Sequence, residues 1–266
     1  VEYAMSLKLL VGAEVDKMVS IVMVTAVLAV ALVRARRLLV RSVADEAAAT
    51  ELSRFFAPDV AETIIDADEA IRPGVGVLRR AAAMFIDLRG FTTLSTTMEP
   101  TSLVGMLGEY QALVVPIIRS HRGSVSTYLG DGIMVTFGAT RDSNTCAADA
   151  LAATEELVEA LRLWAEGRRV NNLPGPEAGI GVAWGTVIYG AIGTEDRLEY
   201  AVIGDPVNRA AKLQALTKTL GARALVAGVA WAMAIEQGFQ SLRPHQQHQA
   251  WAVAGLAEPI EVIAVQ

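Results

Sequence analysis

The stretch Ser124–Gly138 (SVSTYLGDGIMVTFG) contains two segments with strand patterns, joined by Gly130-Asp131-Gly132. Gly and Asp tolerate the backbone conformations that tight hairpin turns require, so they are typical of such a junction. The stretch therefore predicts a β-hairpin that carries one carboxylate, Asp131, at its tip.

Segments on both sides of this hairpin alternate between strand and helix patterns. Arg80–Asp87 is a continuous apolar run that ends on a carboxylate, as expected of a buried strand, and Pro100–His121 has a helical period. A second helix is expected from about Asp142 to Arg168, with Asp142 or Ser143 as its N-cap. Together these segments give the order β-α-β-β-α.

The remaining segments extend the same alternation. They are strands at Ala178–Gly193 and Arg197–Gly204, a helix at Asp205–Gly221, short strands at Arg223–Ala227 and Glu258–Val265, and a helix near Val229–Gly238. The polar segment His245–His248 is expected to be a solvated loop. The pattern predicts an α+β sandwich with a ferredoxin-like βαββαβ core, in which helices cover one face of a largely antiparallel sheet.

Composition limits the classes of function. The chain has 266 residues, a net charge of −6 and a single cysteine, Cys146. One cysteine excludes an intramolecular disulfide and a CxxC zinc site. The acidic balance, with no basic stripe beyond the first 41 residues, argues against nucleic acid as a partner.

The apolar excess, with a mean hydropathy of +0.38, is concentrated at the N-terminus. Met18–Val33 holds 16 residues without a charge, which as a helix would measure about 24 Å against a hydrocarbon core of roughly 30 Å. Four arginines follow it, at positions 34, 36, 37 and 41, and predict that the downstream chain is cytoplasmic. A buried or dimerising helix is the alternative, and a cleaved signal peptide is less favoured because the positive cluster follows the apolar run. Because the chain starts at Val1, further spans upstream are left open.

The segment after this run has the composition of a stalk. Arg34–Phe56 is rich in Ala, Leu, Arg and Glu and has no Gly or Pro, which predicts a helix. Pro58 interrupts it, and Arg72–Gly76 is rich in turn residues. We therefore divide the chain into an N-terminal membrane segment (1–33, helix 18–33), a helical stalk and linker (34–76) and a folded domain (77–266).

Two carboxylates, Asp87 and Asp131, are candidate ligands of a metal ion. If the hairpin pairs beside the strand that ends at Asp87, then Asp87 and Asp131 project from the same end of the sheet. Two such oxygen ligands suit Mg²⁺ that is shared with substrate phosphates, and backbone N–H groups of Leu88–Thr92 could bind those phosphates at a helix start. Taken singly, Asp87 could cap a helix and Asp131 could be only a turn residue.

Three motifs in order resemble the catalytic domain of class III adenylate and guanylate cyclases. They are Phe85–Thr92 (FIDLRGFT), then Gly130–Gly132, whose Asp131 follows Asp87 by 44 residues, and Glu199–Lys212 (EYAVIGDPVNRAAK). The resemblance runs over roughly residues 79 to 265. It implies the class III nucleotide cyclase fold, and hence that the folded domain, residues 77–266, is catalytic.

The resemblance implies conversion of ATP to 3′,5′-cyclic AMP and pyrophosphate, by attack of the 3′-hydroxyl on the α-phosphorus. Asp87, Asp131 and the backbone carbonyl of Leu88 would bind two Mg²⁺ ions, for which Mn²⁺ could substitute. The substrate phosphates would bind along the segment that contains Leu88, Arg89, Gly90, Phe91 and Thr92.

Family members work as head-to-tail dimers whose sites combine residues of two chains. On that pattern Asn208 would orient the ribose and Lys212 would stabilise charge on the α-phosphoryl group. The partner would be a second copy or a related cyclase chain. The resemblance thus implies an enzyme held at the cell membrane by its N-terminal segment, with the catalytic domain in the cytoplasm and the stalk coupling an upstream input to dimer geometry.

Three positions depart from the family pattern. Lys212 stands where Arg is usual, Thr127 stands where a base-selecting Lys is frequent, and Ala201 stands where its Asp or Thr partner is frequent. The sequence therefore carries no clear signature for ATP or for GTP. The alternatives to an adenylate cyclase are a guanylate cyclase and a weakly active or regulatory cyclase-fold subunit. No GG[DE]EF-like motif supports a diguanylate cyclase.

Overall fold

The computed structural model describes residues 15, 17–37, 74–195, 197–251, 253 and 259–266. The chain separates into two units, Val1–Phe56 and Ala57–Gln266. In the first unit, Lys17–Arg37 is a helix of 21 residues with a hydropathy of 2.3 and no burial, which makes it a candidate membrane span. At about 32 Å this helix is longer than the uncharged run alone. Most of the expected stalk and linker, residues 38–73, lies outside the described residues.

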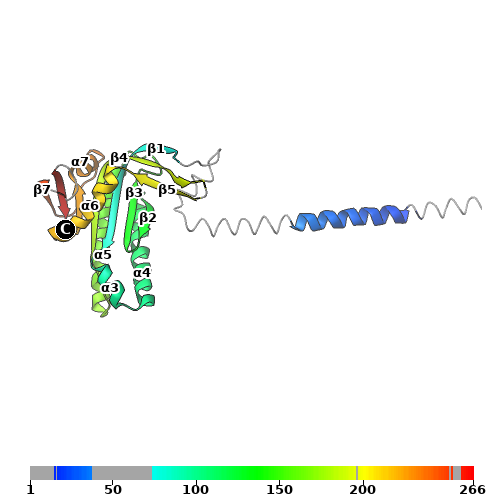
Figure 1. Ribbon diagram of the computed structural model, residues 1–266, viewed down its shortest axis with the longest axis horizontal. Coiled ribbons are helices and arrows are strands. Elements are labelled where there is room, and N and C mark those ends of the chain that lie inside the picture. The colour runs from blue at the N-terminus through cyan, green and yellow to red at the C-terminus, as the bar shows by residue number, and fades with distance from the viewer. Residues whose placement is uncertain (1–14, 16, 38–73, 196, 252, 254–258) are drawn as a thin grey trace, which may run out of the picture. The chain divides into compact units, whose positions relative to one another are not determined.

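The second unit is built on one mixed sheet of eight strands within the described residues, in the order β2-β3-β1-β4-β6-β8-β7, with β5 paired to β4 (Figure 1). The strands are β1 (Gly76–Leu88), β2 (Ser124–Leu129), β3 (Gly132–Phe137), β4 (Ala178–Thr194), β5 (Arg197–Ile203), β6 (Ala224–Ala227), β7 (His245–Trp251) and β8 (Ile260–Val265).

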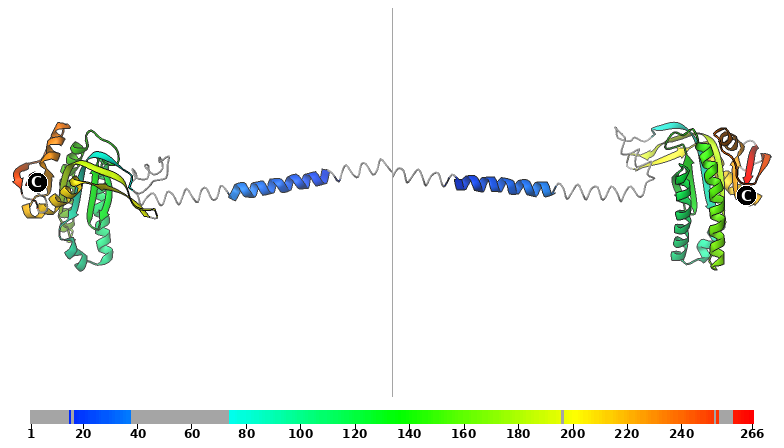
Figure 2. Two further views of the ribbon diagram at one scale, coloured as in Figure 1. Left: turned by 45° about the horizontal axis from the view of Figure 1, so that its top comes forward. Right: turned by 180° about the vertical axis from the view of Figure 1, so that it is seen from behind.

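The helices of this unit are α3 (Phe91–Thr97), α4 (Pro100–Ser120), α5 (Cys146–Val170), α6 (Asp205–Leu220) and α7 (Gly228–Glu236). The connectivity from β1 through α4, β2, β3 and α5 to β4, with β1 between β3 and β4, is the expected ferredoxin-like βαββαβ core. The paired ends of β4 and β5 project from the sheet as an arm (Figures 1 and 2).

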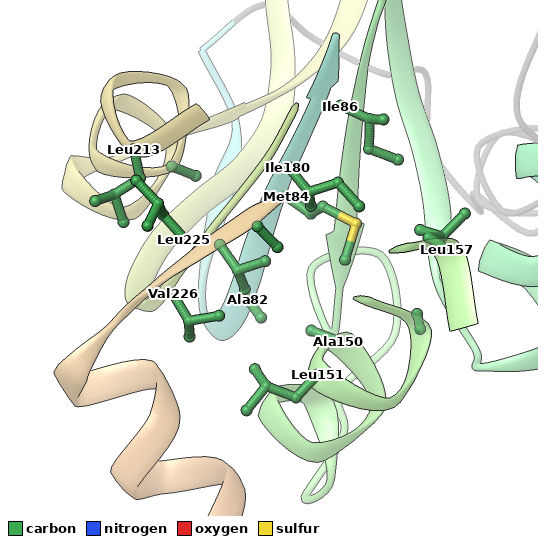
Figure 3. Close-up of a cluster of buried hydrophobic side chains, with 14 of the residues drawn as sticks. Ala82, Met84, Ile86, Ala150, Leu151, Leu157, Ile180, Leu213, Leu225 and Val226 are labelled. Atoms are coloured by element: carbon green, nitrogen blue, oxygen red, sulfur yellow. The ribbon is translucent and has the colours of Figure 1, made fainter. Parts of the chain in front are cut away.

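The core lies against the central strand β1, which pairs with β3 on one side and β4 on the other. Apolar residues of β1, β4 and β6 meet those of α5 and α6 in this core (Figure 3). α4 is apolar enough to pass as a second candidate span. However, Met106, Tyr110, Val114 and Ile118 of α4 are fully buried, so this helix belongs to the core.

Helix α6 lies on the opposite face of the sheet from α5. A Cβ atom on Gly181 of β4 would lie 2.1 Å from the carbonyl oxygen of Ala210 in α6, so this helix rests directly on the strand backbone. Ile180, the neighbour of Gly181, lines a cavity with Leu161 of α5 instead. Because successive strand residues point to opposite faces, the expectation that the helices share one face is wrong for α6.

We expect Gly181→Ala to lower the free energy of unfolding by about 2 kcal/mol or more, because the new methyl group meets backbone that cannot move aside. The matched control is Gly167→Ala in α5, where a Cβ atom meets nothing within 4 Å. Urea unfolding of both variants measures the difference. Equal stabilities would show that α6 does not pack on β4 this closely.

Two local expectations are wrong. Helix α5 begins at Cys146 and not near Asp142, because Ser143 accepts a hydrogen bond from the backbone N–H of Thr145 (3.2 Å) and holds the preceding turn outside the helix. The segment from His245 is not a loop, because it pairs with β8 as strand β7.

Candidate active site

The two carboxylates that the sequence singled out lie at one end of the sheet. Asp87 is the penultimate residue of β1, and Asp131 follows Gly130, whose φ of 71° makes the tight turn between β2 and β3. The pairing of Ile86 with Ile133 brings this turn beside Asp87, and a Cβ atom on Gly132 would lie 3.3 Å from Asp87 Oδ1. The strand pairing therefore brings together residues that are far apart in sequence.

The electrostatics of this pair suit a divalent cation. Burial raises the pKa of Asp87 to about 6, with the negative charge of Asp131 and a hydrogen bond to it adding to the effect. A divalent cation would relieve the repulsion that raises the pKa of Asp87, and the two carboxylates offer the hard oxygen ligands that Mg²⁺ prefers. No group of three or more His, Cys, Asp or Glu side chains suited to a metal occurs among the described residues. Mg²⁺ is usually held by one or two carboxylates, and backbone, water or substrate oxygens would complete its coordination here.

We expect the metal-free protein to lose stability as pH rises from about 4 to about 6. The folded-state pKa of Asp87 is raised above its ordinary value of 3.8, so the folded state binds more protons than the unfolded state in this window. The loss should be about 1 kcal/mol, allowing for solvent near the carboxylate. Thermal unfolding in EDTA at several pH values should show this slope in the wild type and in Asp142→Asn, but not in Asp87→Asn. An unchanged slope in Asp87→Asn would contradict the assignment.

The segment after Asp87 turns sharply into a short helix. Gly90 has a left-handed backbone (φ 76°) and is the N-cap of α3, which begins at Phe91. The N–H of Arg89 already donates to the carbonyl oxygen of Glu177 (2.7 Å), so it is not available to a phosphate. Within the expected phosphate segment, the N–H groups of Gly90, Phe91 and Thr92 are the ones that could serve.

The side chain of Arg89 has a structural role that the sequence did not reveal. Its guanidinium donates to the carbonyl oxygens of Ala222 (2.6 Å) and Thr217 (3.3 Å), at the C-terminal end of α6, and pairs with Glu177 (3.3 Å). Arg89 therefore joins the segment beside Asp87 to α6. Only the contacts between distant segments reveal this, because an arginine after an aspartate carries no such signal.

Asn208 and Lys212 lie one turn apart on α6, so their side chains share a face of that helix. Pro206 and Ala210 contact β4 at Gly185 and Gly181, and Asn208 is on the other side of the helix, exposed. Lys212 is half-buried.

The structure does not bring Asn208 to Asp87 of the same chain. Asp87 pairs with Gly179, whereas Pro206 and Ala210, two residues to either side of Asn208, contact Gly185 and Gly181. Asn208 is therefore level with about Ala183, four residues or about 13 Å along β4 from the partner of Asp87, and it lies on the far side of α6. This separation favours a site that takes Asp87 and Asn208 from two different chains.

Thr127 and Ala201 lie on different strands. Thr127 follows a bulge in β2 and pairs with Met134, which in turn pairs with Phe85, so Thr127 is on the same sheet face as Asp87. Ala201 is on β5, where it pairs with Gly190 of the arm. A methyl group cannot form hydrogen bonds with a nucleotide base, so Ala201 could contribute shape and backbone contacts only.

Tyr110 of α4 is a further residue that sequence reasoning missed. Its ring is fully buried, and its hydroxyl forms no hydrogen bond with the described residues. Burial raises the pKa of this hydroxyl, and the charges of Asp87 and Asp131 add to the increase. In the sequence Tyr110 is indistinguishable from an ordinary core residue of an amphipathic helix.

Comparison with known proteins agrees with this geometry. Residues 78–229, more than half of the chain, match the family described as adenylate and guanylate cyclase catalytic domain. Uncharacterized protein Rv1318c of Mycobacterium tuberculosis is 38% identical over 162 residues, which cover 61% of this chain and 28% of that protein. Uncharacterized protein Rv1319c of the same organism is 34% identical over 171 residues, which cover 64% and 30%. The chain thus spans less than a third of these curated relatives.

Solved structures share the fold. The adenylyl cyclase CyaB from P. aeruginosa superposes with a TM-score of 0.62 at 22% identity, over 72% of this chain and 96% of that one. The guanylyl cyclase Cya2 gives 0.61 at 28% identity, over 71% and 93%. A bacterial light-regulated adenylyl cyclase gives 0.69 at 20% identity, over 86% and 62%.

Proposed function

Because the chain belongs to the family of adenylate and guanylate cyclase catalytic domains, we propose that it converts ATP to 3′,5′-cyclic AMP and pyrophosphate in cyclic-nucleotide signalling. The observation that carries this proposal is the Asp87–Asp131 pair, which the pairing of β1 with β3 holds together beside the start of α3. In the reaction, the 3′-oxygen bonds to the α-phosphorus as the bond from that phosphorus to the pyrophosphate oxygen breaks.

Different residues of this chain would bind the metal ions and the substrate phosphates. Asp87, Asp131 and the carbonyl oxygen of Leu88 would hold two Mg²⁺ or Mn²⁺ ions, which lower the pKa of the attacking hydroxyl and neutralise the triphosphate. Gly90, Phe91 and Thr92 would orient the phosphates through their backbone N–H groups. Positioning and charge stabilisation supply most of the catalysis in such transfers.

The other half of each site would come from a second chain. Asn208 would orient the ribose, and the ammonium of Lys212 would act at the α-phosphoryl group as a point charge where the family usually has Arg. The separation of Asn208 from Asp87 within one chain, about 13 Å along β4 with Asn208 on the far side of α6, supports this division. Exposed apolar residues of paired strands, Leu78, Ile188 and Ile203, form a row across the arm that a head-to-tail partner, a second copy or a related chain, could cover.

The N-terminal unit supports a membrane tether. The helix Lys17–Arg37 is long enough to span, and it ends in arginines at positions 34, 36 and 37. Positive residues after the apolar segment would place the catalytic domain in the cytoplasm.

The nucleotide that the protein converts, ATP, GTP or neither, distinguishes the proposed adenylate cyclase from its two alternatives. Thr127 and Ala201 lack the charged groups that would read adenine, and they give no signature for guanine either, so a guanylate cyclase and a regulatory subunit stand as the alternatives. The test is to incubate the full chain with Mn²⁺ or Mg²⁺ and either ATP or GTP, and to measure cyclic product and pyrophosphate. Preferential formation of cyclic AMP supports the proposal, and preferential cyclic GMP replaces it. No product from either, with Asp87→Ala indistinguishable from the wild type, would leave the regulatory subunit.

A further inference from the structure

A cavity of about 230 Å³ lies between α5 and the beginnings of β4 and β6, on the opposite face of the sheet from Asp87. Its floor is apolar and includes Leu161 of α5 and Ile180 of β4. Its charged lining residues are three arginines, Arg162, Arg169 and Arg223, and two glutamates, Glu166 and Glu177. The cavity thus combines an apolar floor with a rim that carries one more positive than negative side chain.

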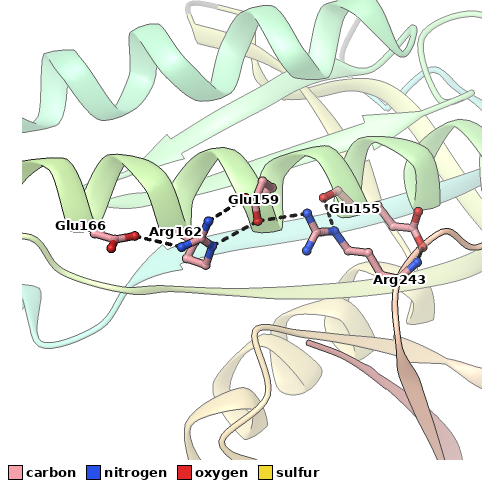
Figure 4. A network of polar contacts seen from close by, with 5 residues as sticks. All are labelled: Glu155, Glu159, Arg162, Glu166 and Arg243. Atoms are coloured by element: carbon pink, nitrogen blue, oxygen red, sulfur yellow. Dashed lines mark hydrogen bonds and ion pairs between the residues drawn. The ribbon is translucent and has the colours of Figure 1, made fainter.

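The three arginines are not equally neutralised. Arg162 is held by Glu159 (2.7 Å) and Glu166 (2.9 Å), in a network that also includes Arg243 (Figure 4). Arg169 has only a long contact, 3.9 Å, with Glu177. Arg223 is half-buried and forms no hydrogen bond or ion pair through its side chain with any described residue. A half-buried guanidinium without a counter-ion favours an anion.

One wall of the cavity is connected to the segment beside the carboxylate pair. Glu177 lines the cavity, accepts the backbone N–H of Arg89 (2.7 Å) and pairs with the Arg89 guanidinium (3.3 Å). Arg89 lies two residues after Asp87. A ligand that changes the contacts of Glu177 therefore acts on the segment that positions Asp87.

We propose that this cavity is a regulatory site for a small organic carboxylate with an apolar body. The carboxylate pairs with Arg223 and Arg169, and the body packs on Leu161 and Ile180. Once Arg169 is engaged by the ligand, the carboxylate of Glu177 is left to Arg89, which steadies the segment after Asp87 and strengthens cation binding there. The regulatory role rests on the proposed function, whereas binding of the ligand does not.

Binding is tested on the full chain by calorimetry and by thermal stabilisation, at about 0.15 M salt so that weak surface attraction is screened. The probes are benzoate, inorganic phosphate, which lacks the apolar body, and benzylamine, which has the opposite charge. We expect saturable binding of benzoate alone. Binding of phosphate as tight as that of benzoate, or no saturable benzoate binding at millimolar concentrations, would overturn the proposal.

Arg223→Gln and Arg169→Gln should each weaken benzoate binding at least tenfold, whereas Arg119→Gln, at an exposed position of α4, should not. Two variants are used so that the result does not depend on the folding of one, and each is checked by its unfolding temperature without benzoate. Undiminished benzoate binding by both folded variants would contradict the assignment.

Coupling is measured without turnover. Saturating benzoate should increase the affinity for Mg²⁺, measured by the Mg²⁺-dependent rise in unfolding temperature, by about fivefold. Glu177→Gln should keep benzoate binding but lose this effect. If benzoate binds and does not change Mg²⁺ affinity, the regulatory part is wrong while the proposed cyclase activity is unaffected.

Discussion

Replacement of Asp87 or Asp131 by Asn is expected to reduce formation of cyclic nucleotide by about 1,000-fold or more. Asn keeps the size of the side chain but removes the negative charge that two divalent ions require, and metal-dependent charge stabilisation supplies several kcal/mol of the barrier reduction. The measurement is kcat for product formation in Mg²⁺ and in Mn²⁺.

The matched control is Asp142→Asn, which removes an exposed carboxylate before α5. It should keep full activity. Asp87→Asn should at the same time be more stable than the wild type in EDTA at pH 7, since it removes the unfavourable charge of a buried carboxylate pair. Retained activity in either Asn variant, with an intact fold, would exclude the two carboxylates as the metal ligands.

Mixing two inactive variants should restore activity if each site is shared between chains. Asp87→Asn and Asn208→Ala are each expected to be inactive alone. In a mixed dimer one site carries both lesions and the other carries none. Because random mixing makes half of the dimers mixed, about one quarter of wild-type activity should return.

The control for mixing is the pair Asp87→Asn and Asp131→Asn. These lesions lie in the same half of the site, so every site in a mixed dimer keeps one lesion and no activity should return. Recovery in this control, or none with Asn208→Ala, would contradict a site that combines Asp87 of one chain with Asn208 of another. In this assay the two variants are mixed, their subunits exchange without unfolding, and the cyclic product is then measured.

Local sequence signals predicted the parts of the fold that short segments determine. The Gly130–Gly132 turn, the apolar strand that ends at Asp87 and the helix that begins at Asp205 all lie where the patterns indicated. The meeting of Asp87 with Asp131 could also be anticipated, because a hairpin beside a strand brings its tip to that strand's end.

Other contacts between distant segments were not predictable. The sequence of α6 does not show which face of the sheet this helix covers. The face is determined by glycines of β4, and in the sequence these glycines only weaken the strand pattern. The position of Arg89 after a metal-ligand candidate suggested phosphate binding, whereas its guanidinium caps α6. The start of α5 was displaced because Ser143 holds the preceding turn, a competition between side-chain and helical hydrogen bonding that sequence pattern does not resolve.

The close packing of α6 on the glycines of β4 also limits how such an enzyme can be controlled. Because the backbone of α6 packs directly on the backbone of β4, the helix cannot slide along the strand. The distance between Asp87 and Asn208 within one subunit is therefore constant. A signal from outside the domain can then change the distance between Asp87 of one subunit and Asn208 of the other only by re-orienting whole subunits. Small rotations at the far end of a rigid body become large displacements at the catalytic groups.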